Sequence, residues 1–299
     1  MAGDSYFRAE VRSRISLTPN LVRVRFGCPR PPRGGAADLA DFTSSGVADE
    51  RLVVVFPAVG QSEPPAPVLT PTGWDYPDPA TRPPMRSYTV RAFDPVVQEL
   101  TIDFVAHQGG VAAEWARRAR PGDAVLVTAA AGWYAPPADA TWQLLVADLT
   151  GLPALARICE TSTLPTTAVV EVLDPADRQP LPSRVEARWL CGSGNGDGPS
   201  ALHRALRDLD WPAGPGYLWF AGEAAESRAV RRYLRQHLGW PADRYDVLGY
   251  WRVGQEEWSR RYAAVSADLE HVYTEARDRG LSSTEALEVY DDALERIGL

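Results

Sequence analysis

Short hydrophobic runs separated by proline and glycine dominate the first half of the chain. Their residues are β-branched or alternate with polar ones, a pattern typical of an antiparallel sheet closed into a small barrel. One helical segment interrupts them at residues 111–120, before a Pro-Gly-Asp turn, and the proline-rich stretch 57–84 is expected to be a surface loop. The expected strands are 21–26, 51–56, 86–91, 100–105 and 124–127.

The pattern changes after the linker-like segment 132–137. Continuous hydrophobic runs now alternate with helical stretches, which favours a doubly wound α/β domain with a parallel sheet. The expected strands are 144–147, 168–172, 187–190 and 217–220, and the expected helices are 152–160, 200–209 and 224–238. We therefore divide the chain into a barrel domain (1–135), an α/β domain (140–254) and a C-terminal helical extension (255–299).

The extension carries its own helix signals. Ser282 and Glu285 have the spacing of a capping box, and hydrophobic residues recur downstream on one helical face. We expect this helix to pack on the body of the protein, with dimerisation as the alternative, so the chain is either a monomer or a homodimer. The expected face consists of Leu287, Tyr290, Leu294 and Ile297.

Composition narrows the class of protein. The 299 residues are 45% hydrophobic and 23% charged, as in a globular protein with two cores, and no apolar run is long enough to cross a bilayer. A net charge of −8 argues against a nucleic acid or a membrane as partner. Three separated cysteines and the lack of an apolar block in the first thirty residues lead us to expect a cytoplasmic protein. The chain contains no lysine, which excludes lysine-based chemistry.

The segment Arg86-Ser87-Tyr88-Thr89-Val90-Arg91 combines cations, a ring and hydroxyl groups on one expected strand. A guanidinium can bind pyrophosphate oxygens through two hydrogen bonds, and a tyrosine ring offers a flat surface for an isoalloxazine. A threonine hydroxyl is small enough to reach the edge of that ring system. Alternatively, the run is an ordinary strand with exposed arginines.

Four later segments strengthen the first reading. They are Asp103 to Trp115, Asp148-Leu149-Thr150-Gly151-Leu152-Pro153-Ala154, Phe220-Ala221-Gly222-Glu223-Ala224 and Gly249-Tyr250-Trp251-Arg252. In this order, with R-x-Y-T before them, they resemble the siderophore-interacting proteins, which are flavin-dependent ferric-siderophore reductases of the ferredoxin-reductase type. The resemblance implies FAD on the barrel and NADPH or NADH on the parallel sheet.

The resemblance also implies which residues bind the two cofactors. Glycines that precede a helix expose backbone donors, so the start of helix 111–120 suits phosphate groups, and Thr150 is expected to cap the helix that follows it. The cofactor-binding residues expected on this basis are Arg86, Ser87, Tyr88, Thr89, Arg91, Asp103, Val105, His107, Gly110, Val111, Ala112, Ala113, Trp115, Thr150, Leu152, Pro153, Gly222, Glu223, Ala224 and Trp251.

The implied reaction passes hydride from a reduced nicotinamide to FAD and then single electrons to iron(III) in a siderophore. Because the protein mainly holds donor and acceptor close together, we expect no catalytic acid, base or nucleophile and no protein-bound metal. Ferric siderophores are commonly anionic, and we expect Arg51, Arg91 and Arg252 to bind them.

Three departures from the family pattern leave alternatives open. Gly110-Val111 replaces Gly-Pro, Asp148-Leu149 replaces an acidic pair, and Cys191-Gly192 replaces His-Arg, which removes a partner for the 2′-phosphate of NADPH. The glycine-rich run 192–198 is out of register for a dinucleotide motif, so a flexible connector is the favoured reading. The alternative functions are a general flavin reductase, a biosynthetic flavoenzyme, and a siderophore-binding protein without reductase activity.

Overall fold

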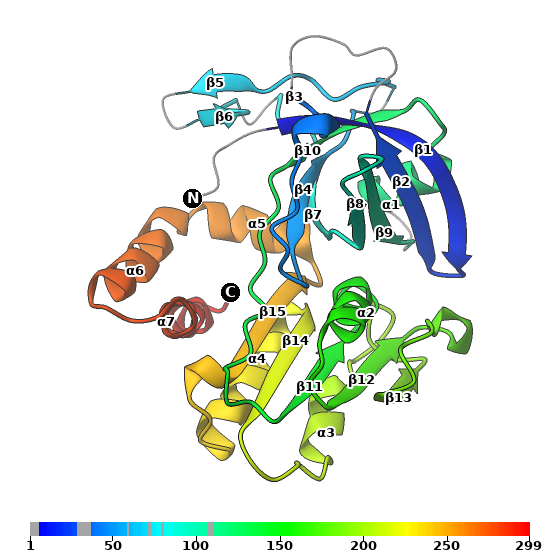
Figure 1. Cartoon of the computed structure of the whole chain (residues 1–299). Helices are drawn as coiled ribbons and strands as arrows, with labels where there is room; N and C mark the ends of the chain where they lie inside the picture. The colour runs from blue at the N-terminus through cyan, green and yellow to red at the C-terminus, as the bar shows by residue number, and fades with distance from the viewer. Residues whose placement is uncertain (1–5, 29–36, 59, 71–72, 79–80, 107–109) are drawn as a thin grey trace.

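The chain folds into two stacked domains with a helical extension along one side (Figure 1). This computed structural model describes residues 6–28, 37–58, 60–70, 73–78, 81–106 and 110–299. The barrel domain lies above the parallel-sheet domain in this view, and the extension joins the end of the sheet to the side of both domains. The predicted two-domain fold is confirmed.

The first domain is an eight-stranded, mainly antiparallel sheet. Its strand order is β7-β4-β10-β1-β2-β9-β8, with β3 parallel to β1. Valine, leucine and phenylalanine side chains from alternate positions fill its interior, and helix α1 (Val111–Arg118) packs against the same core. The strands are β1 (Tyr6–Thr18), β2 (Leu21–Gly27), β3 (Ala37–Asp38), β4 (Arg51–Val55), β7 (Met85–Thr89), β8 (Ala92–Asp94), β9 (Glu99–Val105) and β10 (Ala124–Thr128).

Two features of the barrel domain depart from the sequence analysis. The 13-residue strand β1 was not among the expected strands, because its second half carries exposed polar residues that hide the alternation. The stretch 57–84 is not purely loop, since it contains the hairpin β5 (Val68–Thr70) and β6 (Gly73–Asp75). Three large hydrophobic side chains of this hairpin, Val68, Leu69 and Trp74, are exposed.

The second domain is a five-stranded parallel sheet with the order β13-β12-β11-β14-β15. The three inner strands, β12, β11 and β14, are almost wholly buried because helices cover both faces, whereas the edge strand β13 is largely exposed. Strand β15 was not recognised in the sequence, although its last residues were singled out as a motif. The elements are β11 (Trp142–Ala147), α2 (Leu152–Thr161), β12 (Thr166–Val172), β13 (Val185–Cys191), α3 (Leu202–Arg207), β14 (Gly216–Glu223), α4 (Ala224–Arg232), a π-helical turn (Tyr233–His237) and β15 (Tyr245–Trp251).

The extension consists of α5 (Gln255–Ala263), α6 (Ser266–Asp278) and α7 (Ser283–Arg296). The predicted capping box is confirmed: the Ser282 backbone N–H donates to Glu285 at 2.7 Å, and the Glu285 N–H donates to the Ser282 hydroxyl at 3.2 Å. Leu294 is buried as expected, but Ile297, which follows the end of α7, is 47% exposed.

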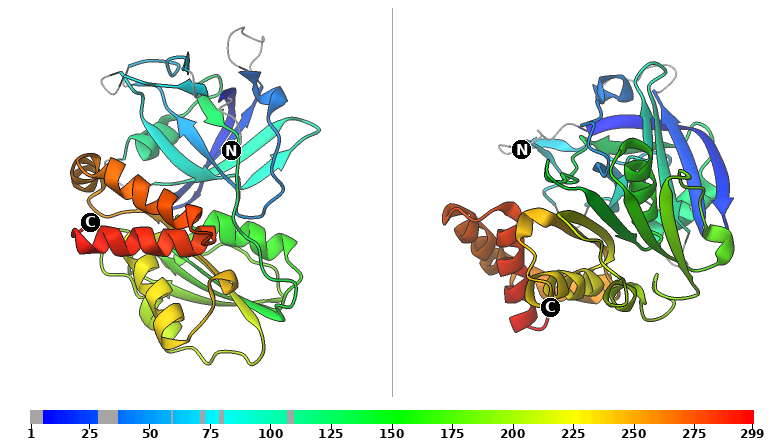
Figure 2. Two further views of the ribbon diagram at one scale, coloured as in Figure 1. Left: turned by 90° about the vertical axis from the view of Figure 1, so that its left-hand side faces the viewer. Right: turned by 60° about the horizontal axis from the view of Figure 1, so that its bottom comes forward.

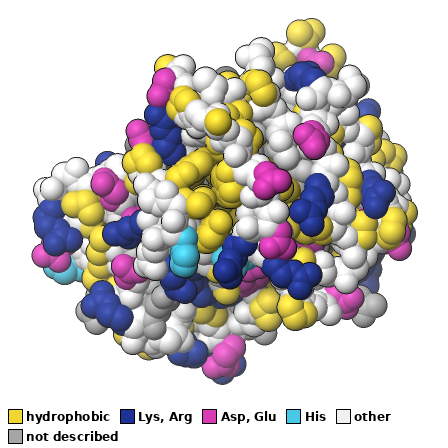
Figure 3. Space-filling model, turned by 90° about the horizontal axis from the view of Figure 1, so that it is seen from below, with side chains coloured by type: hydrophobic (Ala, Val, Ile, Leu, Met, Phe, Trp, Pro, Cys, Tyr) yellow, Lys and Arg dark blue, Asp and Glu magenta, His cyan; other side chains and the backbone are white. Residues whose placement is uncertain are grey.

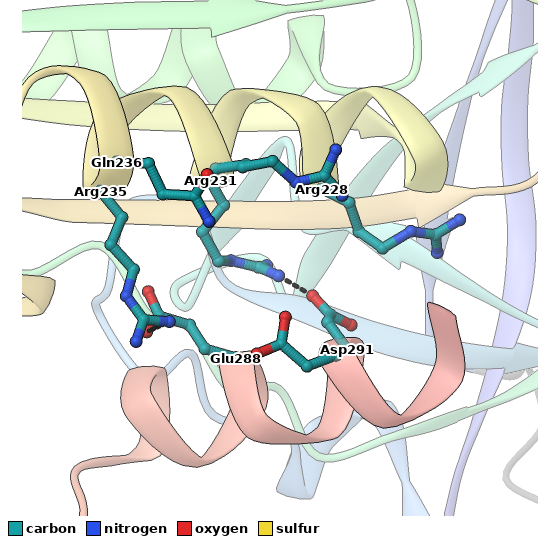
Figure 4. A pocket seen from close by; sticks show the side chains of 8 residues that line it. Arg228, Arg231, Arg235, Gln236, Glu288 and Asp291 are labelled. Carbon is teal, nitrogen blue, oxygen red and sulfur yellow. Dashed lines mark ion pairs between the residues drawn. The ribbon is translucent and has the colours of Figure 1, made fainter. Parts of the chain in front are cut away.

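Helix α7 packs along α4 of the parallel-sheet domain (Figures 2 and 4). Figure 4 shows arginines of α4 facing carboxylates of α7, with Arg231 paired to Asp291. Arg235 pairs with Glu288 at 2.8 Å, and Glu288 also accepts a hydrogen bond from Tyr245. Burial lowers the pKa of Arg231, and the neighbouring carboxylates offset part of that cost. The expected packing of the C-terminal helix on the body is confirmed.

On the face drawn in Figure 3, arginine and carboxylate side chains are interspersed around a hollow lined by hydrophobic side chains. This face therefore carries charges of both signs rather than one continuous basic surface. None of the helices in the described parts of the chain has the length and hydropathy needed to cross a membrane.

Candidate functional site at the domain junction

A buried carboxylate ties the two domains together. Asp49, which is fully buried in the loop before β4, accepts hydrogen bonds from the backbone N–H groups of Trp133 and Tyr134 at 2.8 and 2.9 Å. Its second oxygen accepts from the indole N–H of Trp219 at 3.0 Å. Asp49 thus joins the barrel, the linker between the domains and the centre of the parallel sheet.

The next residue makes a second connection. Glu50 is also fully buried and pairs with Arg157 of α2 at 2.8 Å. Arg157 in turn donates to the backbone carbonyl of Val90 at 2.8 Å. Helix α2 is therefore held against the strand that carries the R-x-Y-T motif.

Arg91 belongs to the same junction. Its guanidinium forms two hydrogen bonds with the Glu160 carboxylate of α2, at 2.5 and 3.0 Å. Arg91 was expected to bind the cofactor and the substrate, but the structure engages both ends of its guanidinium in a contact between the domains. We therefore leave Arg91 out of the site proposed below.

The R-x-Y-T residues lie on β7, which pairs with β4. Arg86 and Ser87 are exposed, and the Arg86 guanidinium donates only to the neighbouring Met85 carbonyl at 2.8 Å. Tyr88 is half-buried, and its ring lies 4.5 Å from that of Phe104. Burial raises the pKa of the Tyr88 phenol, so it stays neutral. The strand thus presents a mobile cation and a fixed ring at its edge.

Thr89 provides a test of whether a ligand fits here. Its hydroxyl is buried and faces the Tyr250 phenol, and neither group has any other hydrogen-bond partner among the described residues. The two groups approach each other from the barrel and the sheet, and burial raises the pKa of Tyr250. Buried polar groups are almost always satisfied in folded proteins. Two hydroxyl groups that have only each other as partners therefore keep hydrogen-bonding capacity for a polar cofactor edge at this junction.

Strand β9 and helix α1 contain the second motif. Asp103 forms a two-pronged ion pair with Arg23 at 2.6 and 2.7 Å, so its carboxylate is engaged by a neighbouring strand of the barrel. Gly110 precedes α1 in extended conformation, and within the described part of the chain no side chain caps the helix. Its first-turn N–H groups thus suit an anion. His107 lies outside the described residues, and the remaining expected residues of the motif are Val105 (half-buried), Val111 (exposed), Ala112 and Ala113 (buried) and Trp115 (half-buried).

The carboxyl edge of the parallel sheet is organised by Asp148. One of its oxygens accepts from the Thr150 N–H at 2.8 Å, from the Thr150 hydroxyl at 2.6 Å and from the Gly151 N–H at 3.2 Å. The other accepts from the Trp251 indole. Burial raises the pKa of Asp148, while these hydrogen bonds counteract part of the rise. The expectation that Thr150 caps α2 is wrong: the Asp148 carboxylate, a stronger acceptor, satisfies the turn instead.

The remaining predicted residues of the sheet domain lie along the same edge. Glu223 caps α4, accepting from the N–H groups of Ala225 and Glu226 at 2.5 and 3.2 Å. Gly222 is buried, and an added Cβ would lie only 3.2 Å from Asp148. The structure thus brings Gly222, Glu223, Ala224, Thr150 and Trp251 to one edge, with Leu152 and Pro153 buried at the start of α2.

The glycine-rich run 192–198 is a compact turn rather than a featureless connector. Gly194 has φ +65°, and a Cβ there would lie 1.9 Å from an oxygen of Glu171, a buried carboxylate near the end of β12. Asn195 accepts from the Leu149 N–H at 2.8 Å, and the Trp251 ring lies near Gly196. Sequence analysis missed Glu171, which stands in no motif, and Asn195, which lies inside the glycine-rich run but received no role there.

The two other predicted substrate-binding arginines are held by aromatic rings. The guanidinium carbon of Arg51 lies 4.3 Å from the centre of the Trp133 ring and 5.6 Å from that of Tyr250. Arg252 lies 4.3 Å above the Trp258 ring of α5, and burial lowers its pKa. Both arginines are therefore oriented near the domain junction. The described residues contain no cluster of three or more side chains able to hold a metal ion.

Comparison with known proteins agrees with this architecture. Residues 10–133 match the siderophore-interacting FAD-binding domain, and residues 140–254 match the siderophore-interacting protein domain. The chain is 32% identical over 258 residues to the NADPH-dependent ferric-chelate reductase of Escherichia coli. The alignment covers 82% of this chain and 95% of that protein.

Solved structures lead to the same conclusion. A siderophore utilization protein from T. fusca superposes with a TM-score of 0.71 at 33% identity, covering 84% of this chain and 94% of that one. The siderophore-interacting protein SipS of Aeromonas hydrophila superposes with a TM-score of 0.65 at 26% identity, and the match covers 84% of this chain and 99% of that one. The ferredoxin reductase of carbazole 1,9a-dioxygenase, at 15% identity and a TM-score of 0.56, shares the fold. This chain therefore belongs to the siderophore-interacting protein family, and its barrel is the FAD-binding domain of that family.

Proposed function

We propose that this protein is an NAD(P)H-dependent, FAD-containing reductase of ferric siderophores that releases iron as iron(II). Its family and the E. coli ferric-chelate reductase support an oxidoreductase that acts on iron chelates. The observation that carries the proposal is the pair of buried hydroxyl groups of Thr89 and Tyr250, which have no partner among the described residues except each other. They lie where the barrel meets the carboxyl edge of the sheet, the place at which ligands bind in open α/β sheets.

On the barrel, Arg86, Tyr88 and Thr89 would hold FAD together with the start of α1. The exposed guanidinium of Arg86 has room to turn toward a pyrophosphate. Tyr88 is fixed against Phe104 and offers an aromatic surface, and the uncapped helix supplies backbone donors. Bound there, FAD would supply the chemistry that couples a two-electron hydride donor to a one-electron acceptor, so one NAD(P)H would serve two iron(III) ions.

On the sheet, the nicotinamide nucleotide would bind along the edge formed by Gly222, Glu223 and Trp251. The Trp251 indole is held by Asp148, so this ring has a defined position against the incoming nucleotide. Gly192 leaves the end of β13 without the arginine expected for a 2′-phosphate, and for this reason both NADH and NADPH belong in the test. Arg51 and Arg252 would attract the anionic ferric chelate.

Anaerobic spectroscopy tests the reaction in two steps. NADH or NADPH should bleach the visible absorption of the FAD-loaded protein, and a ferric siderophore should then restore it while a ferrous indicator such as ferrozine takes up iron(II). Bleaching without restoration refutes ferric reduction and favours a general flavin reductase or a biosynthetic flavoenzyme. Protein that stays colourless with added FAD favours a siderophore-binding protein without reductase activity.

Two variants test the cofactor site. Arg86→Ala and Tyr88→Ala should each weaken FAD retention at least tenfold, because each removes a direct contact, while circular dichroism reports an intact fold. Arg25→Ala, which removes a half-exposed barrel arginine that pairs only loosely with Glu99, is the matched control and should retain FAD normally. Normal retention by the first two variants would contradict this placement of FAD.

A further inference from the structure

The C-terminal extension meets the sheet domain through charged side chains. Its own hydrophobic cluster includes Leu269, Leu294 and Leu299, and every described member of that cluster lies within the extension. In Figure 4, the side chains that α7 presents to α4 are instead carboxylates, among them Glu288 and Asp291. Charge-assisted hydrogen bonds are strong and directional, so contacts of this kind can hold a neighbouring element in one position.

Both carboxylates act on strand β15. Arg231 of α4, which forms an ion pair with Asp291, is buried and donates to the backbone carbonyl of Val247 at 2.6 Å. Glu288 is also buried and accepts a hydrogen bond from the hydroxyl of Tyr245. Asp291 therefore reaches the middle of β15 through a buried arginine, and Glu288 contacts the first residue of the strand directly.

Strand β15 needs such support because it is the last strand in the order of the parallel sheet. An edge strand has one row of backbone groups that no neighbouring strand pairs, and the hydrogen bond from Arg231 gives one carbonyl group of β15 a side-chain partner. Helix α4 also lies close against the strand, since a Cβ on Gly249 would be 3.2 Å from the Cα of Ala224. Helix α4 and strand β15 are thus packed as one unit, which α7 holds through its carboxylates.

The end of β15 carries two residues of the proposed site. Tyr250 lies at the junction with the barrel, and the Trp251 indole donates to Asp148 at the carboxyl edge of the sheet. Just beyond the strand, the Val253 N–H donates to Glu223, the N-cap of α4, at 3.3 Å. A shift of β15 would therefore move the ring beside which the nicotinamide nucleotide is proposed to bind.

We propose that Asp291 and Glu288 are positioning residues for hydride transfer: through Arg231 and Tyr245 they fix β15, and so place Trp251 against the nicotinamide nucleotide. The inference rests on the proposed function and assigns the C-terminal extension a part in it. A misplacement of about 1 Å can slow a reaction about 100-fold, so a small shift of the strand is enough to matter. The proposed FAD contacts lie mainly on the barrel, and FAD binding should not depend on these two carboxylates.

Two measurements on the FAD-loaded protein test this chain of contacts. Asp291→Asn should accelerate hydrogen–deuterium exchange in peptides from residues 245–253 about threefold or more, and leave peptides from β12 unchanged. It should also slow the bleaching of the flavin absorption by saturating NADH or NADPH about tenfold, while the dissociation constant of FAD changes by less than about twofold. Glu288→Gln should act in the same direction, and Asp291→Glu, which keeps the charge, should restore most of the rate.

A double variant separates positioning from stability. Arg231→Met combined with Asp291→Leu replaces the buried ion pair by apolar side chains, a change that often preserves or raises stability, but it removes the hydrogen bond to Val247. Bleaching should remain about tenfold slow even when the urea midpoint equals that of the wild type. Glu257→Gln is the matched control, because the ion pair of Glu257 with Arg260 stays within α5, and this variant should behave as the wild type.

Several results would overturn the inference. They are an unchanged bleaching rate or unchanged exchange at residues 245–253 in Asp291→Asn, faster exchange throughout the protein, an FAD affinity that falls as much as the rate, or a wild-type rate in the double variant. Wild-type protein that neither nucleotide bleaches would instead refute the proposed function. Faster exchange confined to β15 in Asp291→Asn would then still show that α7 fixes this strand.

Discussion

Asp49 offers the sharpest test of how the junction is held together. The carboxylate is fully buried and satisfies three donors, two backbone N–H groups on one oxygen and the Trp219 indole on the other. Asp49→Asn can still accept from both backbone groups if its amide oxygen takes the first position. Its NH2 group then faces the indole N–H, so that one hydrogen bond becomes a contact between two donors.

The magnitude follows from this geometry. A buried donor left without a partner costs about 1–3 kcal/mol, so Asp49→Asn should lower the free energy of unfolding by about 2 kcal/mol. Asp49→Ala leaves all three donors unpaired and should cost about 3–5 kcal/mol, a large part of the roughly 5–15 kcal/mol that stabilises a typical domain. Urea unfolding at a fixed, saturating FAD concentration measures both values.

A double-mutant cycle isolates the indole contact. Trp219→Phe removes the donor that the asparagine amide would oppose, so Asp49→Asn should cost at least 1 kcal/mol less in the Trp219→Phe background than in the wild type. The reasoning is refuted if Asp49→Asn changes stability by less than about 0.5 kcal/mol, or if its cost is the same in both backgrounds.

Three further predictions concern the cofactor contact, the pH response and the glycine-rich turn. Thr89→Val removes a buried hydroxyl whose one partner among the described residues is the Tyr250 phenol, so it should lower the stability of the apoprotein by no more than about 1 kcal/mol, yet weaken FAD binding about fivefold or more. Equal FAD affinity in fluorescence titrations would contradict the fit. Burial raises the pKa of Asp246 to about 6, above its value in the unfolded chain. The contribution of this group to stability is therefore complete below about pH 4 and is lost as the pH rises through 6. The loss amounts to at most about 3 kcal/mol. Asp246→Asn should flatten thermal-denaturation midpoints between pH 5 and 8, and an unchanged profile would exclude this group as the cause. Gly194→Ala should lower the free energy of unfolding by about 2–4 kcal/mol, because φ is +65° there and the new methyl group would meet Glu171. Gly192→Ala should lower it by only about 1 kcal/mol, because φ is +78° but the surrounding space is open. Equal denaturation midpoints for the two variants would show that the close contact carries no cost.

Local patterns predicted the elements that carry the cofactor motifs. Alternation placed the R-x-Y-T residues on a strand, and the observed β7 begins at Met85 and ends at Thr89. The acidic residue at Glu223 correctly predicted a helix start. Both inferences depend on neighbours in the sequence, which is where periodicity and capping act.

The same reasoning failed where partners come from distant parts of the chain. Nothing near Arg91 in the sequence reveals that Glu160 will pair with it, and Thr150 looks like a cap until the Asp148 carboxylate is seen to fill that role. The pairing of Asp49 with Trp219 spans the two domains. These contacts arise from docking, and a single sequence carries no direct signal for them.

By itself, the sequence determined the two-domain order, the family and the elements on which the flavin motifs lie, because hydrophobic periodicity and local turn chemistry act over a few residues. Only the tertiary structure decided which charged side chains remain available to a ligand. Arg91 is taken up by the domain interface, while Arg51 is stacked between two rings and forms no ion pair or side-chain hydrogen bond with the residues that the structure describes. The physical reason is that charge pairing and burial depend on which surfaces meet, and this is settled only when the barrel and the sheet pack together.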